Sequence, residues 1–315
     1  MQDALWGLTT YFNPERYESR LHNYHAFRRR SRAQGLPLVT VELRTGDLGA
    51  ELVADRDAEV LVQRTSTAVL WHKERLLNIA LDALPRECRY VCWLDADVLF
   101  EDDDWVQRSI RALTRHSVIQ PFENVVKPPR GAEPTEPRHT RLGWWARRVI
   151  FTKRYAVSFC SRYRPGRPRF AGTTGYAWCA RRAVLDRHRF YDRCILGGAD
   201  RELALAFVLP TCEVPERELR IRHHRLRDHI ARWHDEVYGD VRGDVSFLPG
   251  TILHLWHGDP RNRGYIDRHS ILERHDFDPE RHIVIDAGGC WCWGEGTDAL
   301  AADVRTYFAS RREDG

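Results

Sequence analysis

Strand-like and helix-like patterns of apolar residues alternate along the first hundred residues. Apolar runs predict strands at 4–12, 38–43 and 90–100, and a shorter apolar run occupies 59–64. Apolar residues at three- and four-residue steps predict helices at 17–34 and 70–84. Gly35 and Pro85 stand where these helices should end. This order is typical of an α/β sheet with right-handed crossovers.

The alternation continues to the end of the sequence. Further helices are expected at 104–116, from about Ala199, and at 297–312 with Thr297 as its cap, and further strands at 118–122, 175–182 and 251–256. The run 90–100 begins as nearly continuous apolar sequence and then meets acidic residues, which is typical of a central strand buried on both faces. We therefore expect a single α/β domain over 1–315, with a mixed, mostly parallel sheet flanked by helices.

Composition adds little to this pattern. A chain of 315 residues with 43% hydrophobic and 30% charged content is a globular protein, not a disordered or fibrous one. No stretch approaches the ~20 apolar residues of a membrane helix, and the N-terminus lacks the pattern of a signal peptide, so we expect a cytoplasmic protein. The eight cysteines form no CxxC pair, which favours buried thiols over a zinc or redox site.

Basic charge is concentrated between residues 123 and 169, which hold twelve Lys and Arg against three Glu, several prolines and the pair Trp144-Trp145. A basic stretch with aromatic residues suits an anionic partner such as a phosphorylated lipid or a nucleic acid. It equally suits a solvated flap. The segment 123–169 is therefore predicted to be an insertion or flap, and both roles stay open.

Two carboxylates, Asp95 and Asp97, follow the hydrophobic part of the predicted central strand. Open α/β sheets bind ligands outside the carboxyl ends of their strands, and hard divalent cations take oxygen ligands. The pair can therefore hold Mn²⁺ or Mg²⁺, or one carboxylate can bind the metal while the other contacts a ribose. Aspartates that cap a helix or lie in a loop would give the same sequence.

Two glycines, Gly197 and Gly198, precede a predicted helix whose first turn carries Asp200 and Glu202. The glycines allow a tight turn that brings backbone close to a ligand. Acidic residues in a first helical turn are also stabilised by the helix dipole alone. Asp200 is thus either a functional carboxylate or a partner of the dipole.

Two histidines, His254 and His257, flank a Leu-Trp pair just before a glycine turn. Neutral imidazole is a good ligand for a Mn-like ion that carboxylates already hold. Two carboxylates and one imidazole leave room for water and two phosphate oxygens in an octahedral site. A histidine beside an apolar run also fits a position in the core.

Three motifs in this order, WLDADVLF at 93–100, GGADRELALAF at 197–207 and HLWHGD at 254–259, resemble the β-1,4-galactosyltransferase and N-acetylgalactosaminyltransferase group of the GT-A glycosyltransferases. That group shows a DxD, then a turn of the form WGGEDxDL, then an HxxH-like strand whose last histidine binds the metal. The segment KERLLN at 73–78 is similar to the donor-side helix of many GT-A enzymes.

The resemblance implies a GT-A fold and transfer of a sugar from a UDP-sugar to an acceptor hydroxyl. Asp97 and His257 would bind the metal, with His254 ranked behind His257, and Asp95 would contact metal or ribose. Asp200 would take the acceptor proton in an inverting displacement. The expected parts are 1–122 for nucleotide-sugar and metal, the insertion 123–169, and 170–315 for the acceptor side, the third metal ligand and the last helix.

The same scheme assigns further contacts. Donor-binding residues would be Thr10, Asn13, Arg16, Lys73, Arg75, Asn78 and Asp95, and acceptor-binding residues would be Tyr176, Trp178, Gly198 and Glu202. Arg261 and Arg263 could add positive charge near the diphosphate or be ordinary surface charges. Three positions depart from the family motif: Leu196 replaces tryptophan, Ala199 the glutamate before the base, and Arg201 the next acid. Because that glutamate helps to hold an amino-sugar, its loss argues against such an acceptor.

Two other functions are compatible with the sequence. A retaining GT-A enzyme also carries a DxD and a late histidine, and there Asp200 would position the acceptor. A non-catalytic sugar- or nucleic-acid-binding protein would bind its partner through the basic segment, and its acidic residues would remain without a catalytic role. The acceptor could be a glycan, a lipid, a protein or a modified nucleic acid, because one scaffold serves many acceptors.

Overall fold

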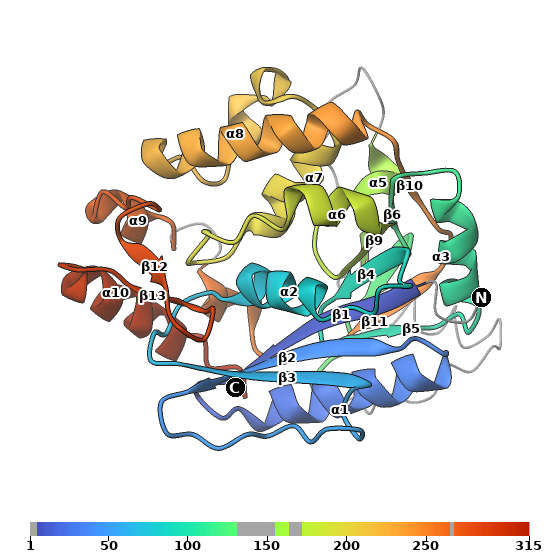
Figure 1. Cartoon of the computed structure of the whole chain (residues 1–315), viewed down its shortest axis with the longest axis horizontal. Helices are drawn as coiled ribbons and strands as arrows, with labels where there is room; N and C mark the ends of the chain where they lie inside the picture. Colours follow the sequence, from blue (N-terminus) through green and yellow to red (C-terminus); the bar gives the residue numbers. More distant parts are fainter. Residues whose placement is uncertain (1–4, 131–154, 164–171, 265–267, 315) are drawn as a thin grey trace.

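The computed structural model describes residues 5–130, 155–163, 172–264 and 268–314 (Figure 1). Its first elements are β1 (Leu5–Phe12), α1 (Glu18–Ala33), β2 (Leu38–Thr45), β3 (Val60–Ser66), α2 (Lys73–Asp82), β4 (Tyr90–Leu94), β5 (Val98–Phe100), α3 (Trp105–Leu113) and β6 (Val118–Gln120). The expected alternation is confirmed here. The helix predicted over 70–84 begins only at Lys73, because the N–H of Trp71 donates to the carbonyl of Ile195 at 2.9 Å.

The remaining α-helices and strands of the described residues follow in chain order. They are β7 (Asn124–Val126), β8 (Tyr155–Val157), α5 (Phe159–Arg162), β9 (Ala177–Arg181), α6 (Arg182–His188), α7 (Ala199–Val208), α8 (His224–Val241), β10 (Val245–Phe247), β11 (Thr251–His254), α9 (Ser270–Arg274), β12 (Ile283–Ile285), β13 (Trp291–Trp293) and α10 (Asp298–Ala309). The 18-residue helix α8 is not predicted from the sequence, because its buried apolar residues are few and most of its sequence is polar.

Seven strands form the main sheet, in the order β10-β6-β9-β4-β1-β2-β3. Neighbouring strands are parallel except at β9, which runs antiparallel to both β4 and β6. One hydrophobic core joins the sheet to α2, α7 and part of α8, and a second joins its other face to α1 and α3. The expected mixed, mostly parallel sheet flanked by helices is therefore confirmed (Figure 1).

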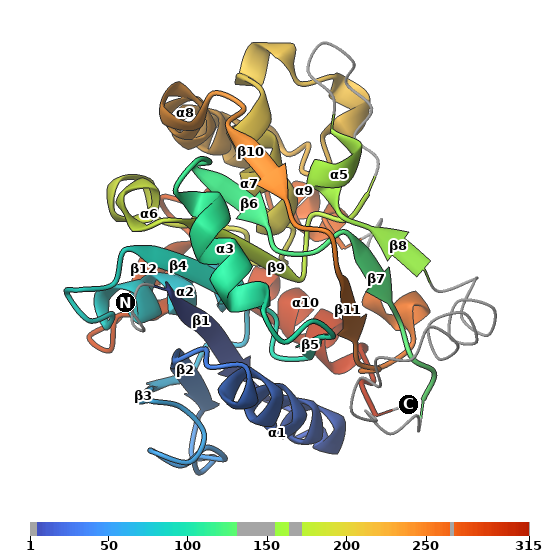
Figure 2. The same cartoon turned by 90° about the vertical axis from the view of Figure 1, so that its right-hand side faces the viewer.

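A second sheet of four strands, in the order β5-β11-β7-β8, lies beside the first (Figure 2). Within it β5 pairs antiparallel with β11, so that Val98 lies opposite His254. The N–H of Leu255 also donates to the carbonyl of Asp97 at 2.9 Å. Because β5 begins directly after the DxD turn, this pairing brings two motifs that are far apart in the sequence into contact.

Several smaller expectations have mixed outcomes. Thr297 directly precedes α10 as predicted, but its hydroxyl donates to the carbonyl of Gly294 at 2.7 Å and does not cap the helix. The eight cysteines are free thiols and six of them are buried, as expected. None of the helices in the described residues is both long and apolar enough to cross a bilayer. Much of the segment 123–169, with Trp144-Trp145, lies outside the described residues, so its role and the limits of the three parts stay predictions.

Candidate functional site

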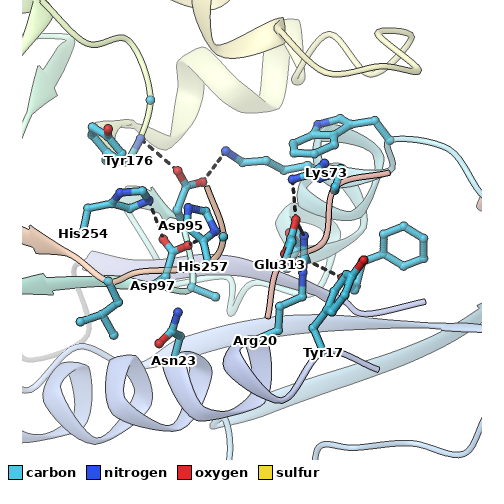
Figure 3. Close-up of a pocket in the computed structure, with 18 of the residues that line it drawn as sticks. Tyr17, Arg20, Asn23, Lys73, Asp95, Asp97, Tyr176, His254, His257 and Glu313 are labelled. Carbon is cyan, nitrogen blue, oxygen red and sulfur yellow. Dashed lines mark hydrogen bonds and ion pairs between the residues drawn. The ribbon is translucent and has the colours of Figure 1, made fainter. Parts of the chain in front are cut away.

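A cavity of about 790 Å³ opens at the carboxyl ends of β1 and β4 (Figure 3). Its wall comes from the loop after β1, from α1, from the start of α2, from the DxD turn and from the start of α7. The end of β11 and the region of α10 close the other side. Ligands of open α/β sheets bind at this edge, and all three sequence motifs contribute residues to this one cavity.

Asp97, His254 and His257 form a compact group of possible metal ligands in the cavity wall. Nδ1 of His257 lies 3.0 Å from one carboxylate oxygen of Asp97, and Nε2 of His254 lies 3.6 Å from the other. One donor atom from each residue falls within 4.8 Å of the others. Two imidazoles and a carboxylate suit a transition-metal ion, Mn²⁺ among them, better than Mg²⁺, which prefers oxygen ligands alone.

The structure separates Asp95 from this group and adds His254 to it. One oxygen of the Asp95 carboxylate pairs with the ammonium of Lys73, and the other accepts the N–H of Tyr176 at 3.1 Å. Asp95 is therefore turned toward α2 and the start of β9 and does not belong to the group around Asp97. His254, which the sequence analysis ranked behind His257, belongs to that group because β5–β11 pairing holds it beside the DxD turn.

Asp200 faces the same part of the cavity from the first turn of α7. The preceding Gly197 and Gly198 have φ of +80° and +104°, which confirms the tight turn predicted for them. A Cβ added to Gly175 would lie 3.1 Å from an oxygen of Asp200 and 4.0 Å from an oxygen of Asp95. Both carboxylates thus lie close to a residue that has no side chain.

Lys73 provides positive charge between these carboxylates. Burial lowers the pKa of Lys73, but the carboxylates of Asp95 and Asp200 more than offset this effect and leave the pKa above its usual value. In the neighbouring Glu74, burial raises the pKa to about 8, although Lys73 opposes the shift. At neutral pH Lys73 is therefore a cation, as contact with a phosphate would require.

Of the predicted donor-binding residues, Thr10, Lys73 and Asp95 line the cavity. The other four do not, and they are Asn13, Arg16, Arg75 and Asn78. Asn13 and Arg16 each contact the carboxylate of Glu51 at 3.2 Å. Arg75 and Asn78 contact the carboxylate of Asp192, at 3.4 and 3.1 Å. Because these side chains are engaged by other protein groups outside the wall, the structure does not support their assignment to a donor.

Two predicted acceptor contacts are corrected by burial. Trp178 is 1% exposed, stacks on Trp93 with ring centroids 6.4 Å apart, and donates its indole N–H to the carbonyl of Thr174. Glu202 is 0% exposed and pairs with Arg227 at 2.7 Å. Neither side chain can reach an acceptor. The other two predicted acceptor residues, Tyr176 and Gly198, do line the cavity.

The two arginines proposed for extra phosphate charge receive no support. Arg261 does not line the cavity. Its side chain is 89% exposed and pairs with Asp259, which does line the cavity. The side chain of Arg263 lies outside the described part of the chain.

Several charged, polar and aromatic residues of the cavity wall are not predicted from the sequence. They include Arg20, Asn23, Trp71, Lys127, Arg268, Arg311 and Glu313. The helical periodicity of 17–34 could have indicated which face of α1 is buried, but not that this face meets the DxD turn. No motif marks Arg311 or Glu313, so only the tertiary structure identifies them.

No family model matches the chain, and no curated protein matches it. Similar solved structures include a Desulfovibrio desulfuricans protein described as a nucleotide-diphospho-sugar transferase, with 11% identity over 97% of this chain and 98% of that chain and a TM-score of 0.35. The catalytic domain of Drosophila β1,4-galactosyltransferase 7 has 11% identity over 63% of this chain and 58% of that chain and a TM-score of 0.30. A mycobacterial protein has 11% identity over 92% and 83% of the two chains and a TM-score of 0.44.

Proposed function

We propose that this protein is a metal-dependent glycosyltransferase of the GT-A type, which moves a sugar from a nucleotide-sugar to an acceptor hydroxyl. The observation that carries the proposal is the meeting of Asp97, His254 and His257 with Asp200 in one cavity at the carboxyl end of a mostly parallel sheet. The resemblance of the three motifs to the galactosyltransferase group adds UDP as the nucleotide.

In this proposal Asp97, His254 and His257 hold a Mn²⁺ ion, which when bound neutralises the charge that develops on the departing diphosphate. Lys73 supplies further positive charge from the start of α2. The acceptor oxygen bonds to the anomeric carbon while the bond from that carbon to the diphosphate oxygen breaks. Asp200 takes the proton of the acceptor hydroxyl, and UDP leaves. A single displacement of this kind inverts the anomeric centre.

The first experiment measures UDP release from a panel of UDP-sugars with Mn²⁺, with Mg²⁺ and with EDTA. We expect slow donor hydrolysis that depends on the metal, is faster with Mn²⁺ and disappears in Asp97→Ala. Asp200→Asn should still bind UDP with Mn²⁺ but lose transfer once an acceptor is found. The matched control is Asp276→Asn, because Asp276 belongs to a second group with His223 and His224 that does not line this cavity.

Two results would contradict parts of the proposal. Absence of metal-dependent nucleotide binding with every donor would reject the transferase and favour a polyanion-binding protein, whose affinity would fall steeply with salt. A product with retained anomeric configuration would keep the transferase but assign Asp200 to acceptor positioning and not to proton transfer.

A further inference from the structure

Two arginines converge on one buried carboxylate in the cavity wall. Arg20, from α1, donates through Nε and Nη2 to the two oxygens of Glu313, the Nη2 bond measuring 2.8 Å. Arg311 places its Nη2 2.8 Å from one of the same oxygens. Glu313 is 1% exposed and Arg311 is 4% exposed, yet all three residues line the cavity.

This arrangement adjoins the candidate metal ligands (Figure 3). A Cβ added to Gly258 would lie 2.9 Å from Cα of Glu313, so Glu313 packs directly against the residue that follows His257. The carboxylates of Glu313 and Asp97 raise the pKa of Arg20, although burial opposes them. Arg20 therefore lies within electrostatic reach of both the carboxylate of Glu313 and the group around Asp97.

The charge and geometry of this trio suit a phosphate. Two guanidinium groups against one carboxylate leave one excess positive charge. A guanidinium fork takes a phosphate in the same bidentate geometry as a carboxylate. In Arg20 the fork is filled by Glu313, and Nη1 donates to the carbonyl of Phe12 at 2.6 Å. The carboxylate of Glu313 thus stands where an incoming phosphate would find its best-oriented donors.

We propose that Arg20 and Arg311 form an anion-binding subsite that Glu313 fills when no substrate is present, and that a phosphate of the donor displaces the Glu313 carboxylate. The identity of that phosphate as the donor's rests on the proposed function, whereas the subsite itself requires only an anion. Only the side chain of Glu313 needs to leave. The backbone beside it stays anchored, because the Asp314 carboxylate accepts the N–H groups of Glu18 and Ser19 at 2.9 and 3.0 Å.

The test is calorimetric binding of inorganic pyrophosphate in EDTA at low salt. Glu313→Gln keeps the shape of the side chain but removes the competing charge. We therefore expect this variant to bind pyrophosphate about tenfold more tightly than wild type does. Asp303→Asn is the matched control, because it removes the same charge from α10 at a carboxylate that pairs with Arg274 and lies outside the cavity wall. The affinity of Asp303→Asn for pyrophosphate should stay within about twofold of the wild-type affinity.

Further variants decide between an anion subsite and a purely structural trio. The double variant Arg20→Gln with Glu313→Gln should lose the gain in affinity. Equal affinity of Glu313→Gln and wild type, or a gain that survives in the double variant, would overturn the proposal. If Glu313→Gln does not fold, Glu313→Asp is measured instead, because its shorter side chain withdraws from the fork and should give a smaller gain with the same dependence on Arg20.

The pyrophosphate test of the subsite and the UDP-binding test of the proposed function can fail independently. Wild-type protein that binds UDP with Mn²⁺, combined with no gain in Glu313→Gln, would reject the subsite and keep the transferase. Absence of metal-dependent UDP binding in wild type, combined with a gain in Glu313→Gln, would keep the subsite and reject the transferase.

Discussion

A methyl group added at Gly175 tests whether Asp200 acts at the reacting atoms. In Gly175→Ala the new Cβ would lie 3.1 Å from an oxygen of Asp200, closer than an ordinary contact, and 4.0 Å from an oxygen of Asp95. The Asp200 carboxylate must then move by a few tenths of an ångström. Because a misplacement of about 1 Å can cost ~10²-fold in rate, we expect the metal-dependent transfer rate to fall roughly tenfold.

Other properties of Gly175→Ala should stay unchanged. Gly175 does not have a positive φ, so alanine fits its backbone and the free energy of unfolding should change by less than about 1 kcal/mol. Mn²⁺-dependent UDP binding should also persist, because the donor atoms of the metal group are not touched. Gly49→Ala is the control, since nothing lies within 4 Å of its added Cβ. A full transfer rate in Gly175→Ala, or a loss of UDP binding, would refute this placement of Asp200.

Three further predictions concern stability, measured by urea unfolding. Trp178→Phe should lose about 1–3 kcal/mol, because it shrinks a core side chain and leaves the Thr174 carbonyl without its indole partner, while UDP binding persists in the folded protein. Burial lowers the pKa of His72 and of His269 to about 4, so the unfolded chain binds more protons below pH 6.5. The contribution of each histidine to the free energy of unfolding is therefore present at pH 7 and is lost as the pH falls from about 6.5 toward 4, by about 2 kcal/mol per histidine at pH 5. In His72→Gln, the difference between the free energies of unfolding at pH 7 and pH 5 should be smaller by about 2 kcal/mol. Gly239→Ala, at an open and exposed position of α8, should gain about 0.5–1 kcal/mol, and no gain would contradict the assignment of this position to a regular helix.

The main strands and several helices could be predicted because their patterns are local. The run before Asp95 is apolar at successive positions, which is typical of a strand covered on both faces, and this is how β4 is packed. The pair Gly197-Gly198 predicted a turn that only glycine adopts easily, and both residues have positive φ. The helix α8 escaped prediction because its polar residues outnumber the few that meet the core.

Side-chain direction in the loops could not be predicted. Thr10 lines the cavity, whereas Asn13, a few residues further along the same segment, turns to the carboxylate of Glu51. Both are polar residues at the carboxyl end of the same strand, Thr10 within β1 and Asn13 just after it, so composition does not separate them. Trp178 is a predicted acceptor contact, but a β-strand sends alternate side chains to opposite faces, and this one enters the core.

The sequence by itself determined the α/β architecture and the three motifs, because periodicity, turn residues and the ends of apolar runs depend on neighbouring residues. The tertiary structure decided which motif residues meet. It joined His254 to Asp97 through strand pairing, turned Asp95 toward Lys73, and set Glu313 between two arginines. Each of these contacts links segments far apart in the chain, and their geometry depends on strand register and helix packing, which no local pattern of residues encodes.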